Sequence, residues 1–452
     1  MAEPQIYKSK SQNVLIPTNE SIWQHILSKN LEDTPADKVL VEEYGRKDMS
    51  LTYGSAPRIA ALGAAGLRDV LGLKAGDKIL VIGANTMEFV LIEFAAYWAG
   101  YTAALVNPIA TPYELVHYIS VIDPVAIFAD SGATYKNVIR SFELSKVPTE
   151  KQPPVIEMGA RVEAKYAYNF HHYVQACAKI KATMLRMVPQ TAVALVKDPT
   201  VSKHDLSSVH TIVCAGAVLP PEIITELQKM MKGVVLSQGY GMTEAGGTTI
   251  PRATASSKAG SVGRLLANTE MRFVDDELKD VKRGETGEIL MRTPSAFMYY
   301  INNKEETAEA LLPGGWVRTG DVGRIDEDGY VWLTDRKKDL IKFKGNQVSP
   351  AELENVLLSH PLVREAGVCA KWDSVQETEV PVGYINLQAS VKEADRAKVI
   401  KEIMDFVNGR VSKTKRLRGG LYYLQTFPRS STGKLLRRAL PARLEADRAA
   451  RL

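Results

Sequence analysis

Short apolar runs alternate with helix-like segments in the first third of the chain. Residues 78–82 form an apolar run typical of a buried strand. Asn85 or Thr86 can cap the helix that follows, and Gly100 can end it. Residues 103–106 then form a second apolar run. A strand, a helix and another strand make a βαβ unit, whose strands are parallel, so this region predicts an α/β domain with helices on the faces of its sheet.

The second half of the chain has an antiparallel pattern. Asp328-Gly329 separates the run 322–325 from the alternating run 330–333, which is a strong hairpin signal. Five charged residues, 335–339, then interrupt the apolar pattern, and we interpret them as a surface hinge or linker. The chain is therefore predicted to have a large N-terminal domain, residues 1–335, and a smaller C-terminal α+β domain, residues 336–452.

The C-terminal domain is expected to open with a well-defined helix. Ser349 stands at the N-cap, Pro350 in the first turn, and Glu352 where a capping box requires an acidic residue. The dipeptide His360-Pro361 ends the helical pattern.

Charge and cysteine content narrow the classes of partner. The net charge of +5 and the isoelectric point near 8.8 are mild, and they fit anionic small ligands. The sequence has no zinc pattern and no aromatic RNA-binding signature, so nucleic acid is not expected. The densest basic run is Lys413, Lys415, Arg416 and Arg418. The three cysteines are far apart and form no CxxC pair, which indicates a reducing compartment.

The sequence predicts neither a transmembrane segment nor a signal peptide. Its longest apolar stretch, residues 89–106, is interrupted by Glu93, which favours a buried helix. The final residues Ala450, Arg451 and Leu452 resemble a peroxisomal address of the Ser-Lys-Leu type, which an import receptor would read. We therefore expect a peroxisomal location, and otherwise a cytoplasmic one.

The sharpest chemical signal is the segment 237–244, Ser-Gln-Gly-Tyr-Gly-Met-Thr-Glu, which follows an apolar strand. Gly239 and Gly241 would let the backbone approach a flat ligand, while Thr243 and Glu244 supply a hydroxyl and a carboxylate. By itself, the segment fits a purely structural glycine-rich turn with a helix cap as well as it fits a ligand-binding segment.

Further motifs make the assignment specific. GYGMTE resembles the GYGxTE motif of the adenylate-forming superfamily, which includes acyl-CoA synthetases, 4-coumarate–CoA ligases, luciferases and peptide-synthetase adenylation domains. Other segments resemble the family's motifs in the family's order: 51–53, 107–108, 213–220, 260–266, 284–289, 316–321, 335–345 and 430–434. The resemblance covers nearly the whole chain. In general character the sequence is similar to acyl-CoA ligases of filamentous fungi. It implies an α/β fold with a large multi-sheet N-terminal domain and a small C-terminal lid.

The resemblance implies a role for each matched residue. ATP and a carboxylic acid would form an acyl-adenylate, and coenzyme A would then displace AMP. Asp321 is expected to accept hydrogen bonds from the ribose hydroxyls, with Arg336 supporting the ribose. Glu244 is expected to hold Mg²⁺ and Thr243 a phosphate oxygen. Lys434 is expected to bridge the acid and the α-phosphate. Taken singly, Asp321 and Lys434 fit an ordinary turn residue and a surface lysine.

The same resemblance implies further nucleotide contacts and a moving lid. The remaining expected nucleotide contacts are Ala215, Gly216, Gly239, Tyr240 and Gly241. Lys338 matches the hinge position about which the lid would swing between the half-reactions. That swing would exchange Lys434 for Lys342 and Gln347 at the active site, with Gly345 leaving room for the pantetheine arm of coenzyme A.

One family element is missing from the sequence. The family has a Ser/Thr/Gly-rich loop ending in Pro-Lys-Gly, whose backbone amides wrap the β- and γ-phosphates. Here residues 153–156, which resemble the segment before that loop, are followed closely by residues 170–173, which resemble a region well beyond it. About a hundred residues of the usual length are gone near 157–169, including core strands and part of the acyl pocket.

Three explanations for this gap are open. The transcript could lack an exon, so that the natural protein is an intact ligase. The chain could be a degenerate copy, or a pseudoenzyme that binds nucleotide or acyl groups as a regulatory protein. Lost strands should leave unpaired sheet edges and exposed apolar surface, which favours the first two explanations. An acyl-CoA ligase of fatty-acid or secondary metabolism is the function expected by descent, and the activated acid is not identified.

Overall fold

The chain folds into two compact units in the computed structural model. One unit comprises residues 15–167, and the other comprises residues 1–14 together with 168–452. Neither unit ends at the boundary predicted between residues 335 and 336, which stays a prediction. The structure describes residues 4–16, 23, 33–43, 46, 49–159, 169–216, 219–250, 258, 260–429 and 434–444.

The unit of residues 15–167 is built on a parallel sheet, as the sequence pattern predicts. Its strand order is β5-β4-β6-β7, and every neighbouring pair is parallel. The strands are β4 (Lys78–Ile82), β5 (Thr102–Val106), β6 (Ala126–Asp130) and β7 (Val155–Met158). The first two are the predicted strands of the βαβ unit, so that prediction is confirmed. A small hairpin, β2 (Val39–Glu42) and β3 (Ser50–Thr52), belongs to the same unit.

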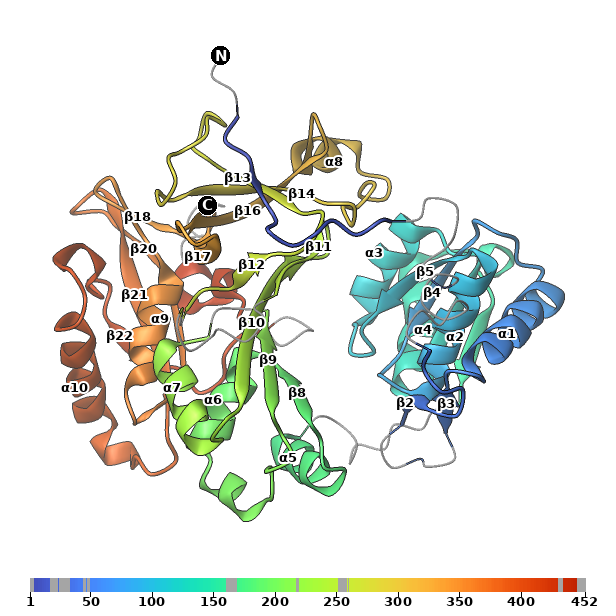
Figure 1. The fold of residues 1–452 in the computed structure, drawn as a ribbon, viewed down its shortest axis with the longest axis horizontal. Helices are drawn as coiled ribbons and strands as arrows, with labels where there is room; N and C mark the ends of the chain where they lie inside the picture. The colour runs from blue at the N-terminus through green and yellow to red at the C-terminus, as the bar shows by residue number, and fades with distance from the viewer. Residues whose placement is uncertain are drawn as a thin grey trace. The chain divides into compact units, whose positions relative to one another are not determined.

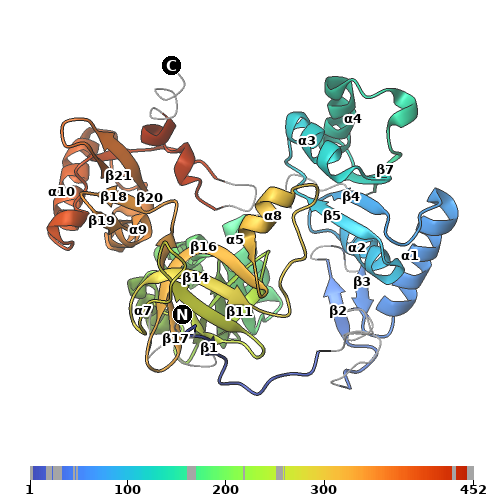
Figure 2. The ribbon, with the colours of Figure 1, turned by 90° about the horizontal axis from the view of Figure 1, so that it is seen from above.

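Helices cover both faces of this sheet (Figure 2). Alternating side chains of β4 enter two separate cores: Ile79 packs in one and Leu80 in the other. The helices are α1 (Ala56–Leu71), α2 (Met87–Ala99), α3 (Pro112–Ile122) and α4 (Ala133–Ser145). The Thr86 hydroxyl accepts a hydrogen bond from the Phe89 amide at the start of α2, and Gly100 ends the helix with φ of 75°. Among the described residues, no helix has the length and apolarity needed to span a membrane.

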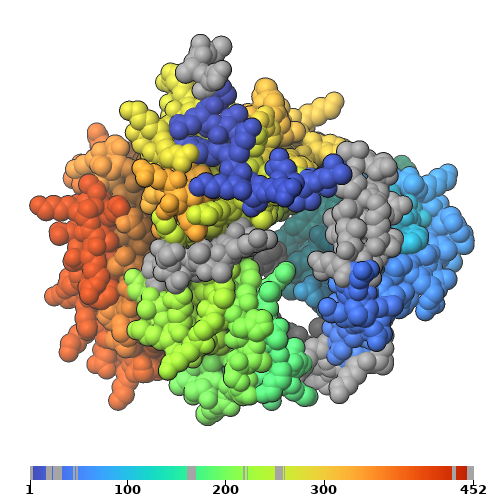
Figure 3. All heavy atoms as spheres, in the orientation of Figure 1, coloured from blue at the N-terminus to red at the C-terminus, as the bar shows by residue number. Residues whose placement is uncertain are grey.

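The larger unit contains an 11-stranded mixed sheet (Figure 1). Its first part is parallel, with the order β8-β9-β10, and β10 turns back into an antiparallel series. The strands are β8 (Met184–Met187), β9 (Thr211–Ala215), β10 (Val235–Met242), β11 (Gly246–Ile250), β12 (Gly263–Leu265), β13 (Glu270–Val274), β14 (Gly287–Arg292), β15 (Leu311–Leu312), β16 (Trp316–Ile325), β17 (Tyr330–Arg336) and β1 (Tyr7–Lys8). Figure 3 shows the start of the chain in dark blue on the surface, where β1 pairs with β13.

Helices pack beside the parallel part of this sheet. They are α5 (Phe170–Lys179), α6 (Pro189–Lys197) and α7 (Pro221–Met230), and they share one apolar core with β8, β9 and β10. A short helix, α8 (Lys304–Ala310), precedes β15.

The residues after β17 form a small α+β region with a core of its own. A hairpin, β18 (Ile341–Phe343) and β19 (Asn346–Val348), comes first, followed by α9 (Pro350–Ser359). A three-stranded sheet follows, with the order β20-β21-β22. The strands are β20 (Val363–Asp373), β21 (Thr378–Leu387) and β22 (Leu421–Tyr423), and helix α10 (Arg396–Asn408) lies between β21 and β22 in the chain. In Figure 1 this region, here called the lid, is orange and red.

Two local predictions about this region need correction. Asp335 and Arg336 are the last residues of β17 and pair with Val322 and Asp321, so the linker is shorter than the charged run suggested. The Asp335 side chain is also buried, because an arginine from the lid neutralises it. Ser349 caps the start of α9 as predicted, but the Glu352 carboxylate binds Lys415, so only half of the capping box forms.

The sheet edge beside the sequence gap is open. Among the described residues, β8 has β9 as its neighbour on one side and is the last strand of the sheet on the other. Met184 on this edge strand is 47% exposed. The junction itself, residues 160–168, lies outside the described residues. An open edge with exposed apolar side chains agrees with the expectation that core strands are missing here.

A buried carboxylate ties β14, β16 and β17 together. Glu288 is 4% exposed and accepts two hydrogen bonds from Arg318, at 2.7 and 2.9 Å, and one from Lys337, at 2.8 Å. Burial pushes the pKa of the Glu288 carboxyl upward, but the bonds from Arg318 and Lys337 outweigh it and hold the pKa below its ordinary value. The ionised carboxylate is therefore the form that stabilises the fold.

We expect Glu288→Gln to lower the free energy of unfolding by about 2 kcal/mol, because two cations lose a charged acceptor. A group with a depressed folded pKa stabilises the protein above its unfolded pKa of about 4.3 and loses that effect as the pH falls. Urea unfolding at pH 7 and pH 4 would measure both effects. The exposed Glu285 is the control, since Glu285→Gln should change stability by less than about 0.5 kcal/mol. Equal effects of the two substitutions would contradict the prediction.

Candidate active site

The candidate site is centred on Asp321. Strands β16 and β17 pair in a register that places Asp321 opposite Arg336, and the Arg336 Nε lies 3.4 Å from the Asp321 Oδ1. The Tyr240 hydroxyl donates a 2.7 Å hydrogen bond to the Asp321 Oδ2. The Asp321 amide donates to the Thr319 hydroxyl at 3.0 Å, which fixes the local backbone. Three predicted nucleotide contacts, Asp321, Arg336 and Tyr240, therefore meet, although they come from β16, β17 and β10.

The environment of Asp321 sets its proton affinity. Burial raises the pKa of the Asp321 carboxyl, while the Tyr240 hydrogen bond and the positive charges of Arg336 and Lys434 oppose that rise. Burial and the neighbouring Asp321 raise the pKa of the Tyr240 phenol in turn. Tyr240 consequently keeps its proton and remains a donor to the carboxylate at neutral pH. The Arg336 side chain is 51% exposed, whereas the Asp321 side chain is only 13% exposed, so the guanidinium is the more accessible of the two groups.

The segment around Tyr240 belongs to the hairpin of β10 and β11. Gly239 and Gly241 lie in β10, and Thr243 lies exposed in the turn that follows. A side chain at Gly241 would collide with the carbonyl oxygen of Gly246 in β11. The glycine at 241 is therefore required by the hairpin itself, which is a packing reason that the sequence reasoning did not give.

Glu244 lies in the same turn and has one partner among the described side chains. The Tyr300 hydroxyl donates a 2.7 Å hydrogen bond to the Glu244 Oε1, and burial together with this bond raises the pKa of Tyr300 to about 12. Tyr300 is a residue that sequence reasoning missed, because it is 56 positions away and lies in no recognised motif. Within the described ranges, no group of three or more His, Cys, Asp or Glu side chains could hold a metal ion.

Lys434 approaches the site from the lid. It is exposed, and a side chain at Gly216 would come within 3.8 Å of the Lys434 Cε. Ala215 ends β9, and Gly216 follows it with φ of 97°, which favours glycine. Together with its effect on the Asp321 pKa, this places Lys434 beside Gly216 and near Asp321. The neighbouring residues 217–218 and 430–433, parts of two quoted motifs, lie outside the described residues.

The second set of predicted catalytic residues lies elsewhere on the lid. Lys342 and Gln347 face each other across the β18–β19 hairpin, and Gly345 is in its turn with φ of 79°. The Lys342 amide donates to Glu379 at 2.8 Å, within the lid. Lys338, the predicted hinge, is exposed in the turn after β17. The structure thus brings Lys434, rather than the Lys342 hairpin, to the surroundings of Asp321.

Helix α6 holds the lid in this arrangement. The Lys197 ammonium donates to the Leu358 carbonyl at 2.9 Å, near the end of α9, and to the Val363 carbonyl at 2.7 Å, at the start of β20. The Gln190 amide, at the other end of α6, donates to Glu365 at 3.3 Å. Burial lowers the pKa of Lys197 to about 8. These contacts were not expected from the sequence, because no motif contains them.

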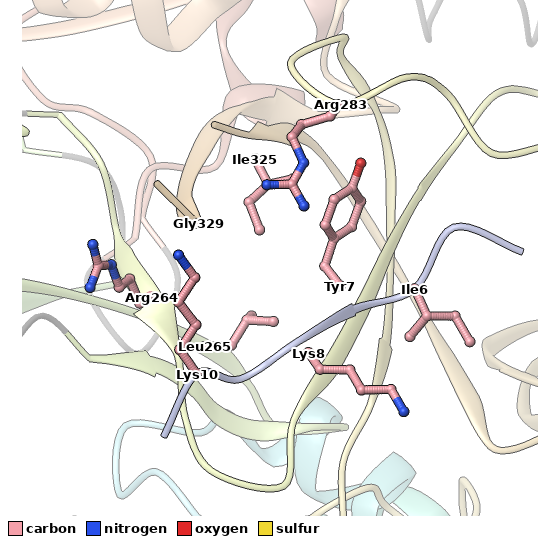
Figure 4. Close-up of a pocket in the computed structure, with 9 residues that line it drawn as sticks. All are labelled: Ile6, Tyr7, Lys8, Lys10, Arg264, Leu265, Arg283, Ile325 and Gly329. Carbon is pink, nitrogen blue, oxygen red and sulfur yellow. The ribbon is translucent and has the colours of Figure 1, made fainter. Parts of the chain in front are cut away.

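A small cavity lies apart from this site (Figure 4). Its volume is about 110 Å³, and it reaches Ile325 at the end of β16, but its lining includes neither Asp321 nor Tyr240. Figure 4 shows the side chains of Lys10 and Arg283 pointing toward it. Both cations donate to backbone carbonyls of the β16–β17 turn, at 3.3 Å each, so they serve the hairpin. We assign no part of the chemistry to this cavity.

Two family models match this chain. The model of the AMP-binding enzyme family matches residues 27–166 and 155–301. The model of the AMP-binding enzyme C-terminal domain matches residues 352–434.

Curated relatives carry the names of CoA ligases. The chain is 37% identical over 290 residues to a probable 4-coumarate–CoA ligase 3 of Dictyostelium discoideum, which covers 63% of this chain and 51% of the relative. It is 36% identical to the peroxisomal OPC-8:0-CoA ligase 1 of Arabidopsis thaliana, over 63% of this chain and 52% of the relative. In these matches the chain spans about half the length of the relative.

A longer match shows that the difference in length lies within the aligned region. The chain is 28% identical to 4-coumarate–CoA ligase 2 of Oryza sativa subsp. japonica over 553 residues, which covers 98% of this chain and 95% of the relative. Because 553 exceeds the 452 residues of this chain, the alignment passes over a segment that the chain lacks. The family model is likewise matched in two pieces, which overlap at residues 155–166, in the region where the phosphate loop is predicted to be missing.

Solved structures with the same fold include ligases of aromatic acids. An anthranilate CoA ligase in complex with anthranoyl-AMP matches with a TM-score of 0.79 and 22% identity, covering 94% of this chain and 97% of that one. The O-succinylbenzoate coenzyme A synthetase of Bacillus subtilis, in complex with AMP, matches with a TM-score of 0.73 and 22% identity, covering 92% and 97%. At these identities the matches show the fold, which confirms the predicted large α/β domain with a smaller C-terminal domain. With family models matched on both sides of the predicted hinge, the chain belongs to the family of AMP-binding enzymes.

Proposed function

We propose that this chain is an acyl-CoA ligase that uses ATP to activate a carboxylic acid. The observation that carries this proposal is the meeting of Asp321, Tyr240 and Arg336, with Lys434 beside Gly216. A buried carboxylate with a tyrosine donor and an arginine suits a ribose, and a nearby lysine suits an anionic reaction centre. The relatives' names point to the same chemistry.

In the first half-reaction, an oxygen of the acid attacks the α-phosphorus of ATP, and the bond to pyrophosphate breaks. Asp321 would accept hydrogen bonds from the ribose hydroxyls and orient the nucleotide. Gly216, Ala215 and Gly239 would line the nucleotide with backbone atoms. Lys434 would neutralise the charge that builds up between the acid and the α-phosphate.

In the second half-reaction, the sulfur of coenzyme A attacks the acyl carbon and AMP leaves with the bonding electrons of the broken bond. The thiol proton passes to solvent. For this step the lid would turn at Lys338, which would replace Lys434 by the β18–β19 hairpin with Lys342 and Gln347. Gly345, in the turn of that hairpin, leaves space for the pantetheine arm.

Mg²⁺ would be held by Glu244 and by the phosphates of ATP. One carboxylate together with phosphate oxygens is a usual set of ligands for this ion, so a single Glu244 fits it. Tyr300 binds one Glu244 oxygen and leaves the other for the ion. The ion would neutralise the phosphates, and Thr243 would contact a phosphate oxygen.

The acid that we propose is an apolar one, aromatic or fatty, used in fatty-acid or secondary metabolism. The relatives named above act by name on 4-coumarate and OPC-8:0, and a solved relative holds anthranoyl-AMP. One relative is named as peroxisomal, and we propose the same compartment here. The residues that would carry the address, Ala450, Arg451 and Leu452, lie outside the described residues.

A second function, a nucleotide- or acyl-binding protein without ligase activity, has one specific observation in its favour. The sequence lacks the loop that wraps the β- and γ-phosphates, while Asp321, Arg336 and Lys434 remain. Such a protein would bind AMP, which has only the α-phosphate, yet would not release pyrophosphate from ATP.

We expect insertion of the missing segment to restore pyrophosphate exchange. The segment would be taken from the rice relative and placed in exchange for residues 160–168. ATP–pyrophosphate exchange by this extended chain should be about a hundredfold faster than exchange by the chain without the insertion, because positioning of the reacting phosphates contributes effects of this size. The assay would use fatty and arylpropenoic acids.

Lys434→Ala in the extended chain is the matched control, and it should reduce exchange by at least about a hundredfold. A folded, monomeric extended chain without exchange for any of these acids would rule out the ligase proposal for them. Equal exchange rates for the chain without the insertion and the extended chain would show that the loop is dispensable.

We also expect the chain without the insertion to bind AMP through Asp321. Asp321→Asn should weaken binding about tenfold, because a charged acceptor is lost, and calorimetry would measure it. Since burial raises the Asp321 pKa, affinity should fall with decreasing pH at a higher pH than for an ordinary aspartate, and the asparagine variant should lose this dependence. Asp328→Asn, at an exposed carboxylate of the β16–β17 turn, should leave affinity unchanged. Equal affinity of the wild-type chain and Asp321→Asn would contradict the assignment.

A further inference from the structure

Arg437 is enclosed by three carboxylates. Its Nε and Nη2 donate to the two oxygens of Glu354, at 2.8 and 2.7 Å. Its Nη1 donates to Asp335 at 3.0 Å and to Asp339 at 3.2 Å. The Arg437 side chain is 19% exposed and that of Asp335 only 3%. All three nitrogens of the guanidinium thus donate hydrogen bonds to carboxylates, which the single ammonium of a lysine could not do in this geometry.

The three carboxylates lie on different sides of the predicted hinge. Asp335 is in β17 and pairs with Val322 of β16, so it belongs to the large sheet. Asp339 follows Lys338, and Glu354 lies on α9 of the lid. If the lid turns at Lys338, Arg437 keeps Glu354 and Asp339 but must leave Asp335. Only one of the three ion pairs therefore crosses the hinge.

Arg437 is also close in sequence to the lysine that reaches the site. It follows Lys434 by three residues, and between them the Leu436 amide donates to the Pro428 carbonyl at 2.9 Å. Arg429 and Leu435 form a bridge on the same two segments. A short, hydrogen-bonded stretch therefore connects the guanidinium to Lys434, and the position of one constrains the other.

We propose that Arg437 is a positioning residue, whose ion pair with Asp335 locks the lid in the arrangement that places Lys434 beside Gly216. The lock would favour adenylate formation and would open for thioester formation. This inference rests on the proposed function and on a hinge at Lys338. It adds a charged contact across the hinge to the contacts of α6 with the lid.

The physical reason is the cost of leaving a buried charge unpaired. A buried ion pair adds little to stability compared with apolar packing, but removal of one partner is unfavourable, so the pair selects one arrangement over others. The lock is also reversible, because Glu354 and Asp339 keep the guanidinium neutralised after the lid moves. Removing the crossing pair should thus shift the population of lid positions without unfolding the lid.

The chain offers a matched pair of substitutions. Asp335→Asn removes the carboxylate that crosses the hinge, while its amide oxygen can still accept from Ser349 and Ala351 at the start of α9. Asp339→Asn removes a carboxylate from the same guanidinium on the lid side. Arg437→Lys is a third variant: a single ammonium can stay with Glu354 but cannot also reach Asp335.

Lid position would be measured in the full chain by electron paramagnetic resonance distances between spin labels. Labels at the exposed positions Lys232 and Lys398 report on the large sheet and the lid, and the three native cysteines are buried. We expect Asp335→Asn and Arg437→Lys to shift the distance distribution toward a second population by about tenfold, and Asp339→Asn to match the unsubstituted protein. Unchanged distributions in folded Asp335→Asn and Arg437→Lys, or equal shifts in both aspartate variants, would overturn the proposal.

The half-reactions provide a second readout in the chain extended by the phosphate-loop segment. Asp335→Asn should slow pyrophosphate exchange about tenfold, yet form thioester from a prepared acyl-adenylate and coenzyme A within about twofold of the unsubstituted rate. A purely structural effect would slow both steps together, which would also overturn the proposal. Absence of exchange in the unsubstituted chain would count against the proposed function alone, because the distance measurement requires no turnover.

Discussion

The antiparallel pairing of β16 with β17 is the constraint on which the site depends. Its register places Asp321 opposite Arg336 and Val322 opposite Asp335. One pair of neighbouring residues on β17 therefore serves two purposes: Arg336 faces the candidate ribose position, and Asp335 faces the lid. A shift of β17 by one residue relative to β16 would move Arg336 and Asp335 to the opposite faces of the sheet and remove both arrangements.

Buried carboxylates recur around this pairing, and each is held by a cation or a hydroxyl donor. Glu288 is neutralised by Arg318 and Lys337, Asp335 by Arg437, and Asp321 is bound by Tyr240. Because an unpaired buried charge is unfavourable, these contacts fix the relative positions of strands, hinge and lid. The proposed ribose site and the proposed lid lock thus rest on the same physical principle.

The gap near residue 160 divides the chemistry of the family into parts that the chain has and a part that it lacks. Contacts proposed for AMP and for the acyl transfer come from segments that are all present. The loop for the β- and γ-phosphates is absent from the sequence, and the edge strand β8 with its exposed Met184 borders the same gap. If the proposed function is correct, AMP binding and pyrophosphate release would therefore be separable in this chain.

The sequence by itself determined the family, the strands 78–82 and 103–106, and the helix capped by Ser349, because these features follow from local patterns and from motifs in order. It named Asp321 and Lys434 through the same motifs. Only the tertiary structure decided that Tyr240 donates to Asp321, that Gly241 is required by its own hairpin, and that Arg437 neutralises Asp335. The physical reason is that pairing across strands and burial of charge depend on which distant segments meet, and no local pattern encodes the partner of a buried charge.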